Sequence, residues 1–251
     1  MSASETPVKS VMIEERVSPE NPDWNFENHR KVYVFFAHQV SGASVLDVGC
    51  GAGYGSELLR TEGGCSEYFG VDYDPGAVSM SERKFGAFGS FAQMDAHELK
   101  FEDRSFDVVV SSENLEHLED PERALSEKAR VLKDDGWVMI GTPNKEMFSP
   151  GEPGSPNPFH KDEFQYLDLW KMMKSHWEQV CIIENFWESD FELGRKQKAV
   201  RLQSGQHGVL HKQRGHYKFC GKVFDMSLLH NTHSFMALAT QARKRTVHAL
   251  R

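Results

Sequence analysis

Apolar residues recur at helical spacing near the start of the chain, ahead of the first strand-like run. Between residues 25 and 40 the apolar positions are Phe26, Val32, Tyr33, Phe35, Phe36 and Val40. Such spacing is typical of one face of an amphipathic helix. The pattern therefore predicts a leading helix over residues 25–40, preceded by a polar and flexible arm over residues 1–24.

Short apolar runs then alternate with helical segments as far as residue 141. The expected strands are residues 44–48, 68–71, 91–94, 106–111 and 137–141, and the expected helices are residues 54–60, 75–85 and 121–132. The last of these helices begins at Asp120-Pro121, an N-cap residue followed by proline. This alternation specifies right-handed crossovers and a mainly parallel sheet, with a ligand crevice at the carboxyl ends of the strands.

The pattern is less regular after residue 141. A loop dense in proline and glycine extends to Pro158, and a helix over residues 162–177 and a strand over residues 180–186 are expected to follow. Residues 188–222 are polar, basic and rich in histidine, without clear periodicity. We expect residues 224–229 and 234–240 to pair as a closing antiparallel hairpin.

Length and composition favour one domain. The chain has 251 residues, of which 39% are hydrophobic, and can bury one sizeable core. It has neither an apolar run of roughly 18 residues nor a secretory signal at its start, so we expect a cytoplasmic protein without a membrane partner. Its four cysteines form no Cys-x-x-Cys pair, which favours reduced thiols over disulfides or a zinc knuckle.

The charge is unevenly distributed along the chain. Residues 195–251 contain 12 Lys/Arg and one acidic residue, whereas the preceding residues contain 17 Lys/Arg and 36 Asp/Glu. The net charge of −8 disfavours general nucleic-acid binding, and only Tyr217 and Phe219 interleave aromatic rings with the basic residues. The basic stretch 212–218 either holds a phosphate or an acidic partner, or packs as a solvated cover on the acidic body.

A glycine-rich loop follows the first expected strand. It reads Asp47-x-Gly49-x-Gly51-x-Gly53, and glycines there allow the backbone to pass close to a ligand. A nicotinamide-binding Gly-x-Gly-x-x-Gly motif does not fit, because its third glycine would fall on Tyr54 or Ser56. The loop therefore favours another nucleotide-like ligand.

Three further segments follow successive strands: Gly70-Val71-Asp72, Met94-Asp95-Ala96 and the run from Ser112 to Leu118, Ser-Glu-Asn-Leu-Glu-His-Leu. With the glycine loop, they make residues 44–145 resemble the class I S-adenosylmethionine-dependent methyltransferases. The resemblance implies an α/β Rossmann-like three-layer sandwich, with a mostly parallel seven-stranded sheet and an antiparallel last strand. It also implies a single domain over residues 25–251, in which residues 25–43 are a leading helix cover and residues 146–251 contain a loop, a basic insertion and closing strands.

The same resemblance implies S-adenosylmethionine as cofactor and S-adenosylhomocysteine as product. Asp72 would accept the ribose hydroxyls, Asp95 the adenine amino group, and Asp47 the amino group of the methionine moiety. The other implied cofactor residues are Gly49, Gly51 and Gly53 in the loop, Tyr73 against the adenine ring, the Ala96 amide at a ring nitrogen, and Glu113 near the methionine end. Taken singly, Asp72 or Asp95 could instead be a helix N-cap.

Methyl transfer to a hydroxyl requires a base, and two histidines are candidate catalytic residues. His117 follows the fourth expected strand, and His160 lies in the proline-rich loop three residues before Glu163. Core packing or a helix-start hydrogen bond is the alternative for His117, and capping of the following helix is the alternative for His160. Residues 142–164 resemble a methyltransferase subgroup associated with sugars and glycoconjugates.

The leading helix resembles the same subgroup, in which it folds over the cofactor. Arg30 would then bind the methionine carboxylate, although it could equally be a solvated helix residue, and Tyr33 could serve packing alone. His207, His211 and His216 lack an apolar scaffold or a nearby carboxylate, so we expect no metal there.

The leading hypothesis is O-methylation of a small-molecule hydroxyl, on a sugar or another natural product. N-methylation of an amino sugar or amine is the runner-up. An RNA methyltransferase and a cofactor-binding protein without turnover are alternatives of other classes. A phosphate on the acceptor and a homodimer both stay open.

Overall fold

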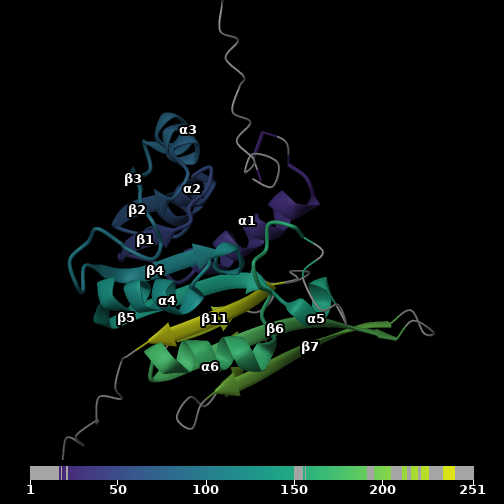
Figure 1. Ribbon diagram of the computed structural model, residues 1–251. Helices are drawn as coiled ribbons and strands as arrows, with labels where there is room; N and C mark the ends of the chain where they lie inside the picture. Colours follow the sequence, from purple (N-terminus) through teal and green to yellow (C-terminus); the bar gives the residue numbers. More distant parts are fainter. Residues whose placement is uncertain are drawn as a thin grey trace, which may run out of the picture.

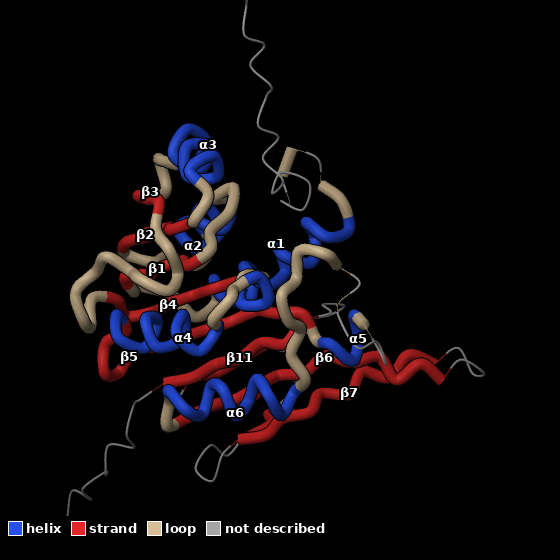
Figure 2. The backbone as a smooth tube through the Cα atoms, in the orientation of Figure 1, coloured by secondary structure: helices blue, strands red, loops and turns tan. Residues whose placement is uncertain are grey.

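The computed structural model describes residues 17, 19–20, 22–149, 155, 157–190, 195–204, 211–213, 216–219, 222–225 and 234–240. Most of the expected arm therefore lies outside the described residues. The elements run from purple to yellow along the chain in Figure 1, and Figure 2 separates helices, strands and loops by colour. None of the described helices is both long and apolar enough to cross a membrane.

The central element is a mixed sheet with the order β3-β2-β1-β4-β5-β11-β6-β7. Its strands are β1 Ser44–Val48, β2 Glu67–Asp72, β3 Ser90–Gln93, β4 Phe106–Ser112, β5 Leu132–Pro143, β6 Gln179–Asp190, β7 Arg195–Ser204 and β11 Ser234–Thr240. The first five strands in this order are parallel, and β11 runs antiparallel to both β5 and β6. The expected parallel sheet with an antiparallel last strand is confirmed, and β7 extends it by pairing antiparallel with β6.

Helices cover both faces of this sheet and make the two outer layers. They are α1 Trp24–Ala37, α2 Tyr54–Thr61, α3 Pro75–Phe85, α4 Pro121–Val131, α5 Lys145–Phe148 and α6 Tyr166–His176, with a 3-10 helix, η1, at Leu115–His117. Buried residues of α1, α2 and α3 form one apolar cluster with the sheet. Those of α4 and α6, which lie side by side in Figure 1, form a second cluster. The Rossmann-like three-layer arrangement is thus confirmed.

Two helices begin where the sequence signals predict. Asp120 accepts a hydrogen bond from the Arg123 amide at 3.0 Å at the start of α4. Asp74 likewise accepts from the Gly76 amide at 2.7 Å at the start of α3. In both cases proline occupies the first helical turn, where the absence of an N–H costs nothing.

Several boundaries differ from the expected ones. The predicted hairpin of residues 224–229 with 234–240 is wrong, because β5 and β6 occupy both edges of β11. Phe224 and Asp225 instead belong to β10 Lys222–Asp225. This strand forms a separate three-stranded sheet with β8 His211–Gln213 and β9 His216–Phe219. Strand β5 begins immediately after α4 rather than at residue 137, since a register shift lets Leu132 pair with Phe106.

One lysine lies inside the core beneath α4. Lys128 is fully buried, and its Nζ has no hydrogen-bond partner among the described residues. Burial lowers the pKa of Lys128 to about 7. The unfolded chain therefore binds more protons than the folded one between about pH 7 and pH 10, so stability rises with pH across this window.

Replacing this lysine by an apolar residue should stabilise the fold. We expect Lys128→Met to raise the free energy of unfolding at neutral pH by roughly 1–3 kcal/mol, because an unsatisfied buried amine is removed. The variant should also lose the rise in stability between about pH 7 and pH 9. Urea unfolding at several pH values measures both effects, with Lys171→Met on the exposed face of α6 as the control. An unchanged pH dependence in Lys128→Met would contradict the prediction.

Candidate functional site

The glycine loop joins β1 to α2 at the carboxyl edge of the sheet. Gly49, Gly51 and Gly53 all have positive φ angles, of 82°, 55° and 82°. A Cβ at Gly49 would lie 2.5 Å from Cγ of Asn114, so this close approach requires glycine. A Cβ at Gly51 would meet nothing within 4 Å. The loop is therefore packed at its start and open at Gly51, where its backbone can face a ligand.

Asp72 ties this loop to the end of β2. Its Oδ2 accepts from the Gly51 amide at 2.9 Å, and its Oδ1 accepts from the Asp74 amide at 2.9 Å. The carboxylate is half-buried. Because each carboxylate oxygen can accept more than one hydrogen bond, Asp72 keeps the capacity to bind two ligand hydroxyls beside Gly51.

Asp47 lies beneath the loop and is fully buried. Its Oδ2 accepts hydrogen bonds from the hydroxyls of Tyr33, at 2.9 Å, and Tyr68, at 2.8 Å. Its Oδ1 has no hydrogen-bond partner among the described residues. Burial raises the pKa of Asp47 to about 7, although the two tyrosine hydroxyls favour its ionised form. Asp47 therefore joins α1, β1 and β2, and its second oxygen is left for a donor from the crevice.

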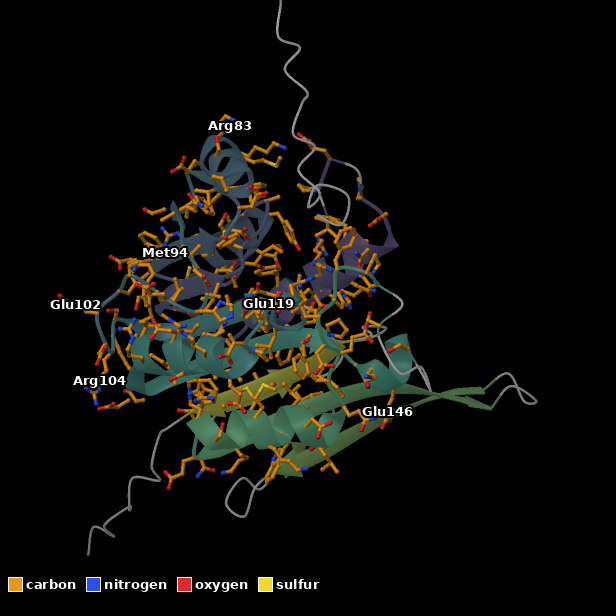
Figure 3. The ribbon with its side chains drawn as sticks, viewed as in Figure 1. Arg83, Met94, Glu102, Arg104, Glu119 and Glu146 are labelled. Atoms are coloured by element: carbon orange, nitrogen blue, oxygen red, sulfur yellow. The ribbon has the colours of Figure 1, made fainter. Side chains whose placement is uncertain are left out.

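The ends of the next strands carry the other expected cofactor residues. Asp95 is exposed after β3, where hydrogen bonds from the His97 amide and then its ring lower the pKa of the carboxyl. Ala96 beside it is buried, and Tyr73 is 67% exposed after β2. Figure 3 labels Met94, which marks this edge of the sheet.

Glu113 follows β4 and adopts a φ of 47°, which is strained for a residue with a side chain. Its amide donates to the carbonyl of Gly141 on β5 at 2.8 Å, which holds the turn in place. Its Oε1 lies 3.6 Å from the position of a Cβ built on Gly141. The turn places the Glu113 carboxylate between the ends of β4 and β5, next to the loop that Asn114 packs against.

The two candidate histidines lie together although 43 positions separate them in the sequence. The rings of His117 and His160 have centroids 5.0 Å apart and planes at 74°. Nδ1 of His117 lies 3.1 Å from the carbonyl oxygen of Phe159, and the Lys161 amide donates to the carbonyl of Glu116 at 2.7 Å. These bonds fix η1 against the loop after β5. Exposed Glu119, which follows η1, is labelled in Figure 3.

Glu163 orients His160. Its Oε1 lies 2.8 Å from Nδ1 of His160, and the hydroxyls of Ser149 and Ser155 donate to its two oxygens. Burial opposes ionisation of this carboxyl, but these three hydrogen bonds together hold the pKa of Glu163 below its usual range. Helix α6 has its N-cap at Gln165, so His160 does not cap it. The side chain of His160 is 5% exposed and that of His117 31%.

Arg30 lies on the exposed side of α1. The structure adds three residues that the sequence analysis did not assign to the site: Tyr68, Asn114 and Glu116. Tyr68 belongs to a strand, and the alternation of apolar and polar residues in a strand indicates only which face is buried. Asn114 and Glu116 lie in the run from Ser112 to Leu118, whose sequence does not indicate where their side chains point. His29 on α1 is a fourth addition, because burial and then the nearby His117 lower its pKa to about 4.

The sequence is similar to those of known methyltransferases. Residues 46–140, which run from the glycine loop to β5, match a family described as a methyltransferase domain. The chain is 34% identical over 174 residues to a probable S-adenosylmethionine-dependent methyltransferase of Mycobacterium tuberculosis, covering 68% of this chain and 62% of that protein. It is 35% identical over 150 residues to another from Mycolicibacterium smegmatis, covering 60% and 57%. The chain thus spans about three fifths of the length of these curated relatives.

A solved structure supports the fold over a longer stretch. An S-adenosylmethionine-dependent methyltransferase of Thermotoga maritima superposes with a TM-score of 0.55 at 17% identity, covering 86% of this chain and 92% of that one. At this identity the likeness concerns the fold alone. It includes the strands after residue 140, which the family match does not reach.

The hydroxyl of Tyr33 should control the titration of Asp47. We expect Tyr33→Phe to raise the pKa of Asp47 further above its usual range and to lower the free energy of unfolding by roughly 1 kcal/mol. A carboxyl with a raised folded pKa loses its stabilising contribution as pH rises from about 4 to about 7, and in the variant the loss should continue to higher pH.

Urea unfolding between about pH 5 and pH 9 tests this expectation. Tyr54→Phe is the matched control: its ring centroid lies 5.3 Å from that of Tyr33, it is equally buried, and its hydroxyl does not bind Asp47 in the described structure. Identical pH profiles for the two variants would contradict the assigned role of Tyr33.

Proposed function

We propose that this chain, which over residues 46–140 matches a family described as a methyltransferase domain, is an S-adenosylmethionine-dependent enzyme that methylates a hydroxyl of a small molecule. The observation that carries the proposal is the row of polar groups at successive strand ends beside the open backbone at Gly51. Asp47 and Asp72 lie at the ends of β1 and β2, and Asp95 and Glu113 follow β3 and β4. The names of the curated relatives support the cofactor.

The residues present fit S-adenosylmethionine. Asp72 would hold the ribose hydroxyls, while Asp95 and the Ala96 amide would face the adenine edge, with exposed Tyr73 against its ring. The methionine ammonium would donate to the Gly49 carbonyl and lie near Asp47 and Glu113. This negative surrounding suits a ligand that carries a sulfonium and an ammonium cation. Arg30 would bind the methionine carboxylate from α1.

The transfer is an in-line displacement at the methyl carbon. The acceptor oxygen forms a bond to this carbon, the carbon–sulfur bond breaks, and its electron pair stays on sulfur, so that S-adenosylhomocysteine leaves as a neutral thioether. The acceptor's proton passes to a base. The enzyme therefore has to position the acceptor oxygen and receive one proton.

The histidine pair favours a hydroxyl acceptor over an amine, because an amine that arrives deprotonated needs no base. His160 has a carboxylate partner in Glu163 and follows the base-and-orienter arrangement of general-base catalysis. His117, which is more exposed, is the alternative base at the same position. A sugar or another natural product is the proposed acceptor, because residues 142–164 resemble a methyltransferase subgroup associated with sugars and glycoconjugates.

The basic carboxyl-terminal part supports an acceptor that carries a phosphate. Strands β8, β9 and β10 contain Lys212, Lys218 and Lys222 within a chain that is otherwise strongly acidic. Cations of this kind bind phosphate groups of nucleotide-linked sugars. A homodimer is compatible with this proposal and is not required by it.

Cofactor binding should depend on Asp72. We expect Asp72→Ala to weaken S-adenosylhomocysteine binding by roughly 10-fold or more, since the ribose hydroxyls lose a charged acceptor worth about 1.5–3 kcal/mol. Isothermal titration calorimetry measures the change. Asp134→Ala, which removes an exposed ion pair with Arg104 near the start of β5, should leave the affinity near that of the unmodified protein. Equal affinities for Asp72→Ala and Asp134→Ala would overturn the cofactor assignment.

Removal of His160 should affect turnover more than binding. We expect His160→Ala to lower kcat by roughly 10²–10⁴-fold with little change in the affinity for S-adenosylhomocysteine, as for loss of a general base. A loss of kcat without loss of cofactor affinity is what a purely structural role would not cause. His38→Ala, at the exposed C-cap of α1, is the control. An unaffected rate would remove His160 as the base.

A further inference from the structure

We infer that Glu116, His117 and His160 form a binding site for a divalent transition-metal ion of the zinc class at the carboxyl ends of β4 and β5. One potential ligand atom from each residue lies within 4.8 Å of the other two. Binding of the ion does not depend on the proposed function. Its position beside the methyl group rests on that function.

The spacing of the cluster is close to that of a metal site. Nε2 of His117 lies 3.7 Å from Oε1 of Glu116. An ion with ligands at about 2.1 Å in tetrahedral geometry holds its ligand atoms about 3.4 Å apart. The widest separation in the cluster therefore has to close by roughly 1–1.5 Å when an ion binds.

Each of the three side chains is held by a second partner, as ligands of metal sites are. Since a carbonyl can only accept, Nδ1 of His117 carries its proton toward Phe159 O, and the lone pair is on Nε2. Nδ1 of His160 similarly faces the Glu163 carboxylate. Oε2 of Glu116 accepts from the Thr142 hydroxyl at 2.9 Å, which aims the carboxylate. The tautomers thus present both Nε2 lone pairs.

In the absence of an ion, the side chain of Asn157 binds Nε2 of His160. Its Oδ1 accepts from the Phe159 amide at 3.0 Å, which fixes the orientation of the side-chain amide. Its Nδ2 therefore donates toward Nε2 of His160 at 2.9 Å. An ion that binds Nε2 displaces this one hydrogen bond, while Glu163 keeps the ring in place.

Backbone contacts hold the two halves of the cluster together without the ion. The amides of Lys161 and Asp162 both approach the carbonyl of Glu116, at 2.7 Å and 3.3 Å. Glu116 is itself buried, and a buried carboxylate gains stability from a neighbouring cation. The site is thus largely pre-formed, with entry past the part-exposed His117.

The donor set selects the class of ion. Two imidazole nitrogens and one carboxylate oxygen match the ligands of zinc and similar transition metals, whereas magnesium and calcium prefer oxygen alone. Three protein ligands leave a further position open, as in catalytic rather than structural sites.

The open position would take the acceptor oxygen. A bound divalent ion lowers the pKa of a coordinated hydroxyl and fixes its direction, so that the acceptor is deprotonated at neutral pH. With the ion bound, His117 and His160 act as ligands, and the proton leaves to solvent or to a neighbouring base. Without the ion, His160 acts as base.

Zinc titration of the untagged, chelator-treated full chain tests the inference. Calorimetry should show one Zn²⁺ per chain, and Co²⁺ should give the visible absorption of a site with nitrogen ligands. Glu116→Gln, His117→Ala and His160→Ala should each weaken Zn²⁺ binding at least roughly 10-fold, and Glu163→Gln by about 10–100-fold through misorientation of His160. Circular dichroism and thermal unfolding establish that each variant is folded.

Two controls separate this cluster from other histidines. His176→Ala removes a similar pair, in which Nε2 lies 2.8 Å from Oε2 of Glu122, and should leave zinc affinity unchanged. Combined alanine substitution of His207, His211 and His216 should also leave it unchanged. Failure of Zn²⁺ to bind, or binding lost in the combined variant and kept in Glu116→Gln, would overturn the inference.

The outcome is distinguishable from that of the proposed function. If the unmodified chain does not bind zinc but binds S-adenosylhomocysteine and turns over, the metal site is rejected and the proposed function stands. Zinc binding that depends on Glu116, in a protein that does not bind S-adenosylhomocysteine, would reject the methyltransferase assignment and leave the metal site standing.

Discussion

The buried carboxylate of Asp47 is the interaction on which the rest of the site depends. Tyr33 of α1 and Tyr68 of β2 donate to the same oxygen, so three elements that are distant in sequence meet beneath the glycine loop. A carboxylate in this position is costly to desolvate, and its two tyrosine partners limit that cost. The leading helix is therefore part of the site's foundation, and its attachment is sensitive to the protonation of one acid.

Much of the fold could be predicted because its signals are local. The alternation of apolar runs and helical segments fixes the parallel part of the sheet, and Asp-Pro pairs mark the starts of α3 and α4. The position of β11 could not be predicted in this way. Strand β11 pairs with β5, which lies nearly one hundred residues earlier in the chain, and with β6, from which an insertion separates it. The periodicity within a strand does not indicate which strands lie beside it.

In the candidate site too, features set by the order of the strands could be predicted, and contacts between distant elements could not. Asp47, Asp72, Asp95 and Glu113 could be predicted because parallel strands bring their carboxyl ends to one edge, so order along the chain becomes order in space. The direction of Asp47 could not, since its tyrosine partners lie on other elements. The meeting of His117 with His160, and of both with Glu116, depends on how the loop after β5 folds back on η1, which backbone contacts decide.

These features combine a glycine loop that is open at Gly51 with a group of imidazoles and a carboxylate after β4 and β5. The first part suits a nucleotide-like cationic cofactor, and the second suits activation of an acceptor hydroxyl. A crystal structure with S-adenosylhomocysteine tests this account most directly. It should show the ribose hydroxyls on Asp72, the backbone of Gly51 along the ligand, and the sulfur facing His117 and His160. A ligand bound elsewhere, or one with its sulfur directed away from the histidines, would contradict it.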